Sequence, residues 1–143
     1  MSKFSKFFKN NKVLKPNEKH AVTETLCDES GKPLEWEFKH ISSKDNENIR
    51  ESCTYDVQVT GKPNLYRPKV NTAKYSVKMV VASVAFPDLY DKDLQDSYGV
   101  TTPEDLVYAM VDDPGEYQAL VAYVQKFQGF TKSFEEEVDE AKN

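Results

Sequence analysis

Two histidines and two cysteines are the side chains best suited to metal binding or nucleophilic chemistry. His20 and His40 flank a predicted hairpin, and neither Cys27 nor Cys53 has a histidine or second cysteine at the close spacing of a zinc site. A nucleophilic serine would need an elbow such as Gly-x-Ser-x-Gly, which the sequence lacks. The sequence therefore predicts no metal site and no nucleophilic triad, and we interpret both cysteines as reduced, partly buried thiols.

A run of aspartates is the stretch most similar to a calcium-binding loop: Asp88, Asp91, Asp93 and Asp96. An EF-hand loop requires glycine at its sixth position and glutamate at its twelfth. Counted from Asp91, those positions hold Asp96 and Thr102, so we interpret the run as a solvated polar turn. The five glycines are not grouped as a phosphate-binding loop requires. We therefore expect no cofactor and no enzymatic activity.

Charge and hydropathy argue against binding to nucleic acid or to a membrane. The chain has 143 residues, a formal net charge of -5 and a mean hydropathy of -0.70, which fit one soluble domain. The stretch Tyr66-Arg67-Pro68-Lys69 has too few basic residues for a nucleic-acid site. No apolar run reaches the roughly 18 residues of a membrane span, and the basic start lacks the apolar part of a signal peptide. We expect a protein that stays in the cytoplasm where it is made.

Alternating side chains predict a β-hairpin near the N-terminus. Residues 20–27 are rich in valine and threonine, and a short connection containing Gly-Lys-Pro follows them. After this turn, Leu34, Trp36 and Phe38 fall on one face and charged residues on the other. The three apolar side chains are therefore predicted to be buried.

Capping residues and apolar spacing place the next elements. Ser42 or Ser43 is expected to cap a short, mostly exposed helix, and residues 55–60 are expected to form a strand. Residues 65–71 are interpreted as an irregular connector. From Thr72 onward a helix that is apolar around most of its circumference belongs in the core. The alternative is a buried strand within that apolar stretch, because its final part is short and β-branched.

Two capped amphipathic helices are predicted in the last third of the chain. Thr102-Pro103 and Asp113-Pro114 each place an N-cap before a proline at the first helical position, and Gly129 ends the second helix. Because the link between them is tight, the two helices are expected to pack as an angled or antiparallel pair.

These elements predict an α+β fold, in which an N-terminal β-hairpin or small antiparallel sheet leads into a mostly α-helical C-terminal bundle. We assign residues 16–130 to this single domain. Residues 1–15 form a basic amphipathic N-terminal segment, and residues 131–143 form an acidic C-terminal tail.

The N-terminal segment carries three closely spaced phenylalanines between lysines: Phe4, Phe7 and Phe8. The spacing predicts a short amphipathic helix that is too short to be stable in isolation. We interpret it as a docking helix for self-association, with the acidic tail of a neighbouring copy as one candidate contact. The alternative is that the phenylalanines pack on their own domain.

Three short motifs follow one another in the predicted domain. The hairpin carries Gly31, Pro33, Trp36 and Ile41; the first helix carries Ile49, Arg50 and Cys53; a later element carries Asp93, Leu94, Gln95, Tyr98 and Gly99. Their order and spacing over residues 16–130 resemble the XkdN-like tail assembly chaperones of phages and of phage-derived contractile tail particles in Gram-positive bacteria, which include bacteriocin-like particles.

The resemblance implies a non-enzymatic protein that binds the tape measure protein and keeps it soluble. It also implies help in recruiting tail tube subunits, action in the bacterial host cytoplasm, and absence from the mature tail. A structural component of the tail, such as a tube or baseplate part, is the alternative and should show more strands and a longer exposed sheet edge. We expect partner binding through aromatic side chains of the N-terminal segment and the last helix: Phe4, Phe7, Phe8, Tyr117, Tyr123 and Phe127.

Overall fold

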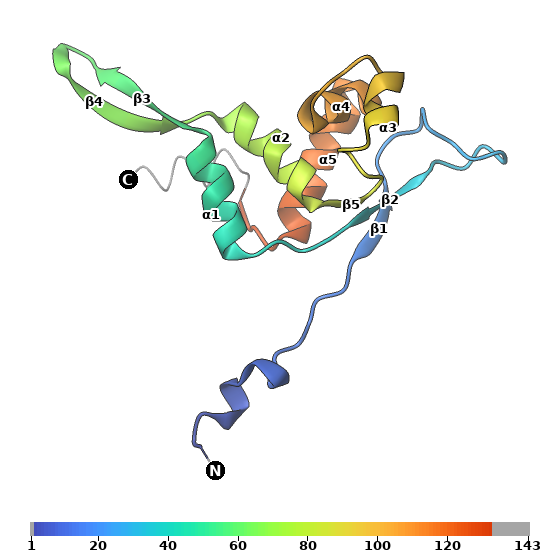
Figure 1. Ribbon diagram of the computed structural model, residues 1–143, viewed down its shortest axis with the longest axis horizontal. Coiled ribbons are helices and arrows are strands. Elements are labelled where there is room, and N and C mark those ends of the chain that lie inside the picture. Colours follow the sequence, from blue (N-terminus) through green and yellow to red (C-terminus); the bar gives the residue numbers. More distant parts are fainter. Residues whose placement is uncertain (1, 133–143) are drawn as a thin grey trace.

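The computed structural model describes residues 2–132 and confirms the α+β class, since a small sheet leads into a group of helices (Figure 1). The sheet is antiparallel, with its strands in the order β1 (Glu18–Ala21), β2 (Glu35–Phe38) and β5 (Val84–Phe86). The first two strands form the predicted hairpin. The third strand directly follows a helix, so the helical and strand interpretations of that apolar stretch are each right for one part of it.

The hairpin has a shorter first strand than the sequence predicts. Strand β1 ends at Ala21 instead of continuing to residue 27. The reason is a carboxylate on a distant helix, because Glu116 accepts hydrogen bonds from the Thr23 hydroxyl at 2.7 Å and from the Glu24 backbone N–H at 2.8 Å.

Burial on β2 follows the predicted alternation for two of the three apolar residues. Trp36 and Phe38 are 2% and 0% exposed, whereas Leu34 is 45% exposed. Leu34 precedes the strand, and its backbone N–H donates to the carbonyl of Leu26 within the loop. The prediction for Leu34 is therefore wrong, since the residue belongs to the turn.

Three helices share the core with the sheet: α2 (Thr72–Ser83), α4 (Pro103–Met110) and α5 (Pro114–Phe127). Helix α2 is the central element because it packs against both other helices and against β5. The largest fully buried side chains come from the sheet, from these three helices and from the end of α4: Trp36, Phe38, Tyr75, Met79, Val80, Leu106, Val107, Val111, Leu120 and Val124.

Side-chain caps begin the helices where the sequence predicts. Helix α1 (Ser43–Ser52) has a capping box, in which the Ser42 hydroxyl accepts the Asp45 N–H at 3.0 Å and the Asp45 carboxylate accepts the Ser42 N–H at 3.2 Å. Thr102 and Asp113 cap α4 and α5 with one side-chain bond each, accepting the N–H of Asp105 and of Gly115, and each precedes a proline. Each cap contributes about 1 kcal/mol, which helps to fix the helix starts.

The end of α5 is joined to the sheet and to α2 by one side chain, Gln128. Its amide nitrogen donates to the Lys39 carbonyl at 2.9 Å and to the Ser83 hydroxyl at 2.8 Å, and its amide oxygen accepts the Ile41 N–H at 3.2 Å. Gly129 then adopts a φ of 87°, which favours glycine and turns the chain away from the helix.

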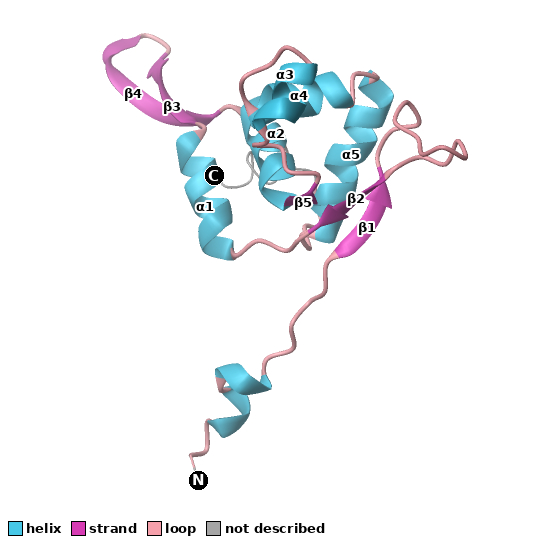
Figure 2. Cartoon of the chain, turned by 45° about the vertical axis from the view of Figure 1, so that its right-hand side comes forward, coloured by secondary structure: helices cyan, strands magenta, loops and turns pink. Residues whose placement is uncertain are grey.

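A two-stranded ribbon, β3 (Thr54–Val59) and β4 (Lys62–Val70), projects from the body of the protein (Figures 1 and 2). The predicted connector over residues 65–71 is therefore wrong, because β4 pairs with β3 along most of its length. The prolines of β4, Pro63 and Pro68, argue against a strand when only the sequence is considered. A strand at an edge tolerates proline, and both strands of the ribbon are edges.

The aspartate-rich run contains a short helix, α3 (Lys92–Ser97), which Asp91 caps by accepting the Leu94 N–H at 2.9 Å. The prediction of a turn throughout this run is thus only partly right. Within residues 2–132, no three His, Cys, Asp or Glu side chains are grouped so that they could hold a metal ion. The same residues include no helix that is long and apolar enough to cross a membrane.

Candidate protein-binding surfaces

Four half-buried rings form a stacked surface on one side of the protein, which we call the aromatic shelf: His20, His40, Tyr123 and Phe127. His20 stacks on Tyr123 with ring centroids 3.9 Å apart, and His40 stacks on Phe127 at 4.0 Å. The two rings of α5 are themselves stacked at 5.9 Å. Each histidine therefore packs on an α5 ring, and the hairpin and α5 together build the shelf.

The shelf rests on the core through Phe38. Its ring is fully buried and lies edge to face against two rings of α5, with centroid distances of 4.9 Å to Tyr123 and 6.4 Å to Phe127. Such aromatic pairs contribute about 0.5–1.5 kcal/mol beyond the area that they bury. The shelf is consequently positioned by the same residues that join the sheet to α5.

A hollow of about 590 Å³ lies over one end of the shelf, and we call it the shelf hollow. Its lining combines the chain that leads into β1 with the end of α5: Lys15, Pro16, Asn17, Glu18, His40, Tyr123, Lys126, Phe127 and Gly129. The Tyr123 hydroxyl is buried and has no hydrogen-bond partner of good geometry within residues 2–132. Burial, followed by the nearby Glu18 carboxylate, raises the pKa of Tyr123, so its hydroxyl stays protonated at neutral pH.

Tyr117 lies in a different hollow, of about 470 Å³, between α2, α4 and α5. Its ring is 5.0 Å from that of Tyr108, and burial, followed by the Tyr108 hydroxyl, raises the pKa of Tyr117. Six residues separate Tyr117 from Tyr123, so the two rings occupy different faces of α5. The structure thus brings together Tyr123 and Phe127 but not Tyr117.

The three phenylalanines of the N-terminal segment are more exposed than the four rings of the shelf. Phe4, Phe7 and Phe8 are 59%, 84% and 51% exposed. The segment forms two single 3-10 turns, Ser5–Phe7 and Lys9–Asn11, instead of the predicted short helix, and it leads away from the body of the protein (Figures 1 and 2). A helix as short as the predicted one forms only when its side chains pack on another surface. The phenylalanines of this segment are not buried against their own domain, so the helix does not form.

A second surface lies between α1 and α2, where three adjoining hollows of about 420, 240 and 220 Å³ share Ala82. We call it the α1–α2 groove. Its apolar lining comes from both helices, from the chain before α1, and from β5 and the chain after it: Ile41, Ile49, Val81, Ala82, Val84, Leu89 and Tyr90. Tyr90 is 71% exposed at its edge. The sequence offers only a weak signal for this groove, because its lining residues come from separate segments.

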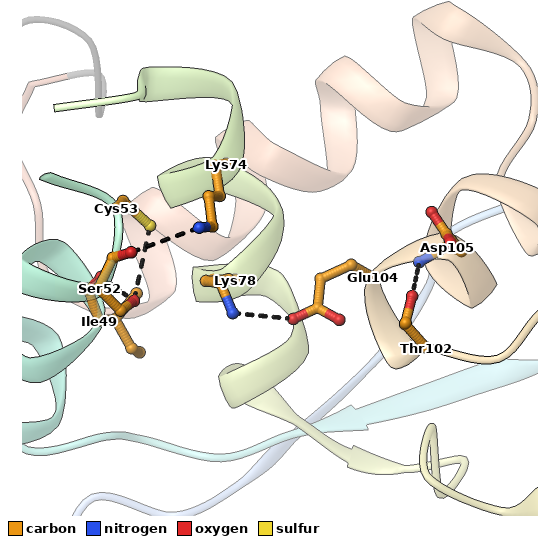
Figure 3. Close-up of polar contacts among 8 residues, drawn as sticks. All are labelled: Ile49, Ser52, Cys53, Lys74, Lys78, Thr102, Glu104 and Asp105. Atoms are coloured by element: carbon orange, nitrogen blue, oxygen red, sulfur yellow. Dashed lines mark hydrogen bonds and ion pairs between the residues drawn. The ribbon is translucent and has the colours of Figure 1, made fainter. Parts of the chain in front are cut away.

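Polar contacts hold the walls of the α1–α2 groove in place (Figure 3). The Lys74 ammonium donates to the Ser52 carbonyl at 3.4 Å, which joins α2 to the end of α1. The Lys78 ammonium lies 3.2 Å from the Glu104 carboxylate, which joins α2 to α4. The buried Cys53 lies beside Ser52, whereas Cys27 is exposed, so the prediction of two partly buried thiols is wrong for Cys27.

Comparison with known proteins decides the family. The model of the family described as phage XkdN-like tail assembly chaperone protein matches residues 4–142. The chain belongs to this family. Its sequence is 22% identical over 138 residues to the phage-like element PBSX protein XkdN of Bacillus subtilis (strain 168), an alignment that covers 96% of this chain and 92% of that protein.

A solved structure supports the fold of this tail assembly chaperone. The crystal structure of the protein yqbn superposes with a TM-score of 0.73 at 15% sequence identity, covering 91% of this chain and 98% of that one. The resemblance predicted from the sequence motifs is therefore confirmed at the level of family and fold. The tail assembly chaperone family is in keeping with a role that is not enzymatic.

Proposed function

We propose that this tail assembly chaperone binds the tape measure protein through the aromatic shelf and the shelf hollow. The observation that carries the proposal is the stack of four half-buried rings beside a hollow of about 590 Å³. Half-buried aromatic rings provide large contact area at low entropic cost, and apolar grooves of this kind accept the apolar face of a partner helix. A tape measure protein, expected to be long and helical, would present such faces repeatedly.

The bound tape measure protein is kept soluble by the acidic exterior of the chaperone, and the complex helps to recruit tail tube subunits. The net charge of -5 favours solubility of a complex that carries many copies. The tape measure protein and the tail tube protein are thus the proposed partners. The proposed setting is the cytoplasm of the bacterial host, and the chaperone leaves before a contractile or bacteriocin-like tail is complete.

The experiment is co-expression of the chaperone with the tape measure protein, read as the soluble yield of the tape measure protein. The chaperone is expected to raise that yield and to co-purify with it. A structural tail component, the alternative, would instead polymerise alone or with tube protein, using the open edges of the β3–β4 ribbon. No gain in soluble yield would contradict the chaperone function itself.

Two matched substitutions decide which surface binds. Tyr123→Phe and Tyr117→Phe each remove one buried hydroxyl that has no partner in residues 2–132, so neither is expected to destabilise the fold. If the shelf hollow binds the partner, Tyr123→Phe should weaken binding about three- to tenfold, the value of one hydrogen bond, and Tyr117→Phe should not. Phe127→Leu, which removes a stacked ring, should weaken binding at least about tenfold. The reverse pattern would assign binding to the hollow between α2, α4 and α5.

A further inference from the structure

The N-terminal arm, residues 2–15, is an unpartnered basic and apolar segment. It carries a lysine at every third position from Lys3 to Lys15 and no acidic residue. Besides the three phenylalanines, Val13 and Leu14 are 85% and 88% exposed. Five large apolar side chains in so short an exposed segment mark a binding element, because single copies of soluble proteins rarely expose apolar groups so densely.

An acidic stretch with the opposite charge borders the α1–α2 groove. Residues 88–113 contain one basic residue, Lys92, and eight acidic ones: Asp88, Asp91, Asp93, Asp96, Glu104, Asp105, Asp112 and Asp113. Asp88 and Glu104 line the hollows of the groove, beside the exposed ring of Tyr90. The lining of the groove also includes Lys39 and Lys78, and Lys78 is paired with Glu104. The negative charge open to a basic segment therefore comes from Asp88 and from the exposed aspartates that follow it.

The other open surfaces of residues 2–132 fit the arm poorly. The shelf hollow is lined by Lys15 and Lys126 against the single Glu18, so its net positive lining disfavours a basic segment. The hollow between α2, α4 and α5 has no charged residue in its lining. The β3–β4 ribbon carries Lys62, Arg67 and Lys69 against the single Asp56, so it is basic as well. The lining of the α1–α2 groove has three carboxylates, Asp45, Asp88 and Glu104, against Lys39 and Lys78, so it is net negative and charge complementarity favours this surface.

We propose that the N-terminal arm of one copy of this protein docks into the α1–α2 groove of a second copy. The phenylalanines enter the hollows around Ala82, and the lysines lie along the acidic stretch of residues 88–113. The arm leads away from its own α1 and α2 in two views of the molecule (Figures 1 and 2), which favours a second copy as the acceptor. Of the four shelf rings only His40 also lines the groove, so this contact leaves His20, Tyr123 and Phe127 open and copies can associate while each binds a partner.

The expected contact is weak for a single arm. Three phenylalanines can bury at most roughly 450–750 Å² of their own surface, and they are already partly covered in the free arm. With a similar area from the groove, the total only just reaches the roughly 1,000 Å² that a stable interface needs. Association should therefore appear at high protein concentration, or where a long partner brings many copies together. The chaperone alone is sufficient for the test, so its outcome does not depend on the proposed binding of the tape measure protein.

The test is the mass of the full chain by sedimentation or light scattering, over two orders of magnitude in concentration. The parent is expected to exceed the monomer mass of 16.4 kDa as concentration rises. Replacing Phe4, Phe7 and Phe8 by serine should abolish this increase without changing the melting temperature, because the arm does not pack on its own domain. A steep fall in melting temperature would show that the arm is part of the core and would overturn the proposal.

A matched pair of tyrosines tests the acceptor. Tyr90→Ser, at the edge of the groove, should weaken association about tenfold, whereas Tyr66→Ser, on the ribbon and 60% exposed, should leave it unchanged. The opposite result would place the contact on the ribbon. A parent that stays monomeric at every concentration would also overturn the proposal, since the arm would then bind its own copy or none.

Charge exchange is an independent test of the proposed contact. Lys6→Glu with Lys9→Glu in one protein, and Asp93→Lys with Asp105→Lys in another, should each weaken self-association, and mixing the two should restore it. Salt at 0.5 M, where the screening length is about 4 Å, should weaken the parent contact. If removal of residues 133–143 abolishes association while the charge variants do not, the acidic tail is the acceptor and the groove is not.

Discussion

Gln128→Glu is the substitution that most directly tests how α5 is joined to the sheet. The change keeps the shape of the side chain but replaces the amide nitrogen with an oxygen. That atom donates to the Lys39 carbonyl and to the Ser83 hydroxyl, which itself donates to the Met79 carbonyl at 2.7 Å. After the change, oxygens would face oxygens at both positions.

The magnitude follows from the bonds that are lost. Two donated hydrogen bonds contribute about 1 kcal/mol each, and the facing oxygens and the negative end of α5 add repulsion, so we expect a loss of about 2–4 kcal/mol. In a chain of this size each kcal/mol lowers the melting temperature by about 2–4 °C. The variant should therefore melt roughly 5–15 °C below the parent.

The loss should depend on pH in a defined direction. The ionised carboxyl is disfavoured in the folded state, so its folded-state pKa is raised above the unfolded value of about 4.3. The variant should consequently approach the parent below that value and lose stability as pH rises through the folded-state pKa. Protonation restores a donor, which is why the difference narrows in acid.

The assay is urea denaturation followed by the fluorescence of Trp36, the only tryptophan and 2% exposed, between pH 4 and 8. Gln118→Glu, on the exposed side of α5, adds the same charge and is the control. It should change stability by less than about 0.5 kcal/mol. If both variants lose the same free energy of unfolding, or if the loss at position 128 does not vary with pH, the hydrogen bonds of Gln128 are not what joins α5 to the sheet and to α2.

Three further outcomes follow from burial and local bonding. Trp36→Ala should cost about 3–5 kcal/mol of unfolding free energy, and a variant that melts like the parent but binds less well would make Trp36 a contact residue. Cys27 should react with a thiol reagent in the native state, while the buried Cys53 should react only after unfolding; equal rates would contradict their different exposure. The pKa of Asp28 lies below its usual 3.8 because the Ser30 side chain donates to it, followed by the Lys32 backbone, so this support of the loop is present above that value and lost as pH falls through the lowered pKa. Ser30→Ala should raise the midpoint of the Asp28 titration measured by NMR, and an unchanged midpoint would exclude that bond.

Helix starts could be predicted because their determinants are local. The Ser42 capping box and the pairs Thr102-Pro103 and Asp113-Pro114 each act within about four residues, and all of them are where the sequence places them. Burial of Trp36 and Phe38 could be predicted equally well, since alternation along a strand is a short-range pattern. These features do not depend on how distant segments meet.

The ribbon and the first hairpin strand could not be placed correctly for the opposite reason. Strand β4 contains prolines, which argue against a strand unless one knows that its outer edge is unpaired. Strand β1 ends where it does because Glu116, more than ninety residues away, bonds to Thr23 and Glu24. The sequence of residues 20–27 alone therefore does not predict that contact.

The candidate surfaces depend on tertiary contacts in the same way. The aromatic residues Tyr123 and Phe127 could be selected from the sequence as partner-binding candidates, but their stacking on His20 and His40 joins three separate segments. By residue type the histidines are candidates for a metal site, whereas in the structure their flat rings widen an apolar surface. The sequence groups Tyr117 with Tyr123 and Phe127, because periodicity along one helix does not show which neighbouring element covers each face.

The positions of the two surfaces support a division of work between them. The aromatic shelf is bordered by lysines and lies beside the root of the arm, whereas the α1–α2 groove is bordered by the acidic stretch of residues 88–113. A chaperone that covers a long partner with many copies needs one surface for the partner and another for its neighbour, and the two must not compete. If Phe127→Leu weakens partner binding but leaves self-association unchanged, and Tyr90→Ser does the reverse, the surfaces act independently. A single substitution that weakens both would mean that partner and neighbouring copy share one site.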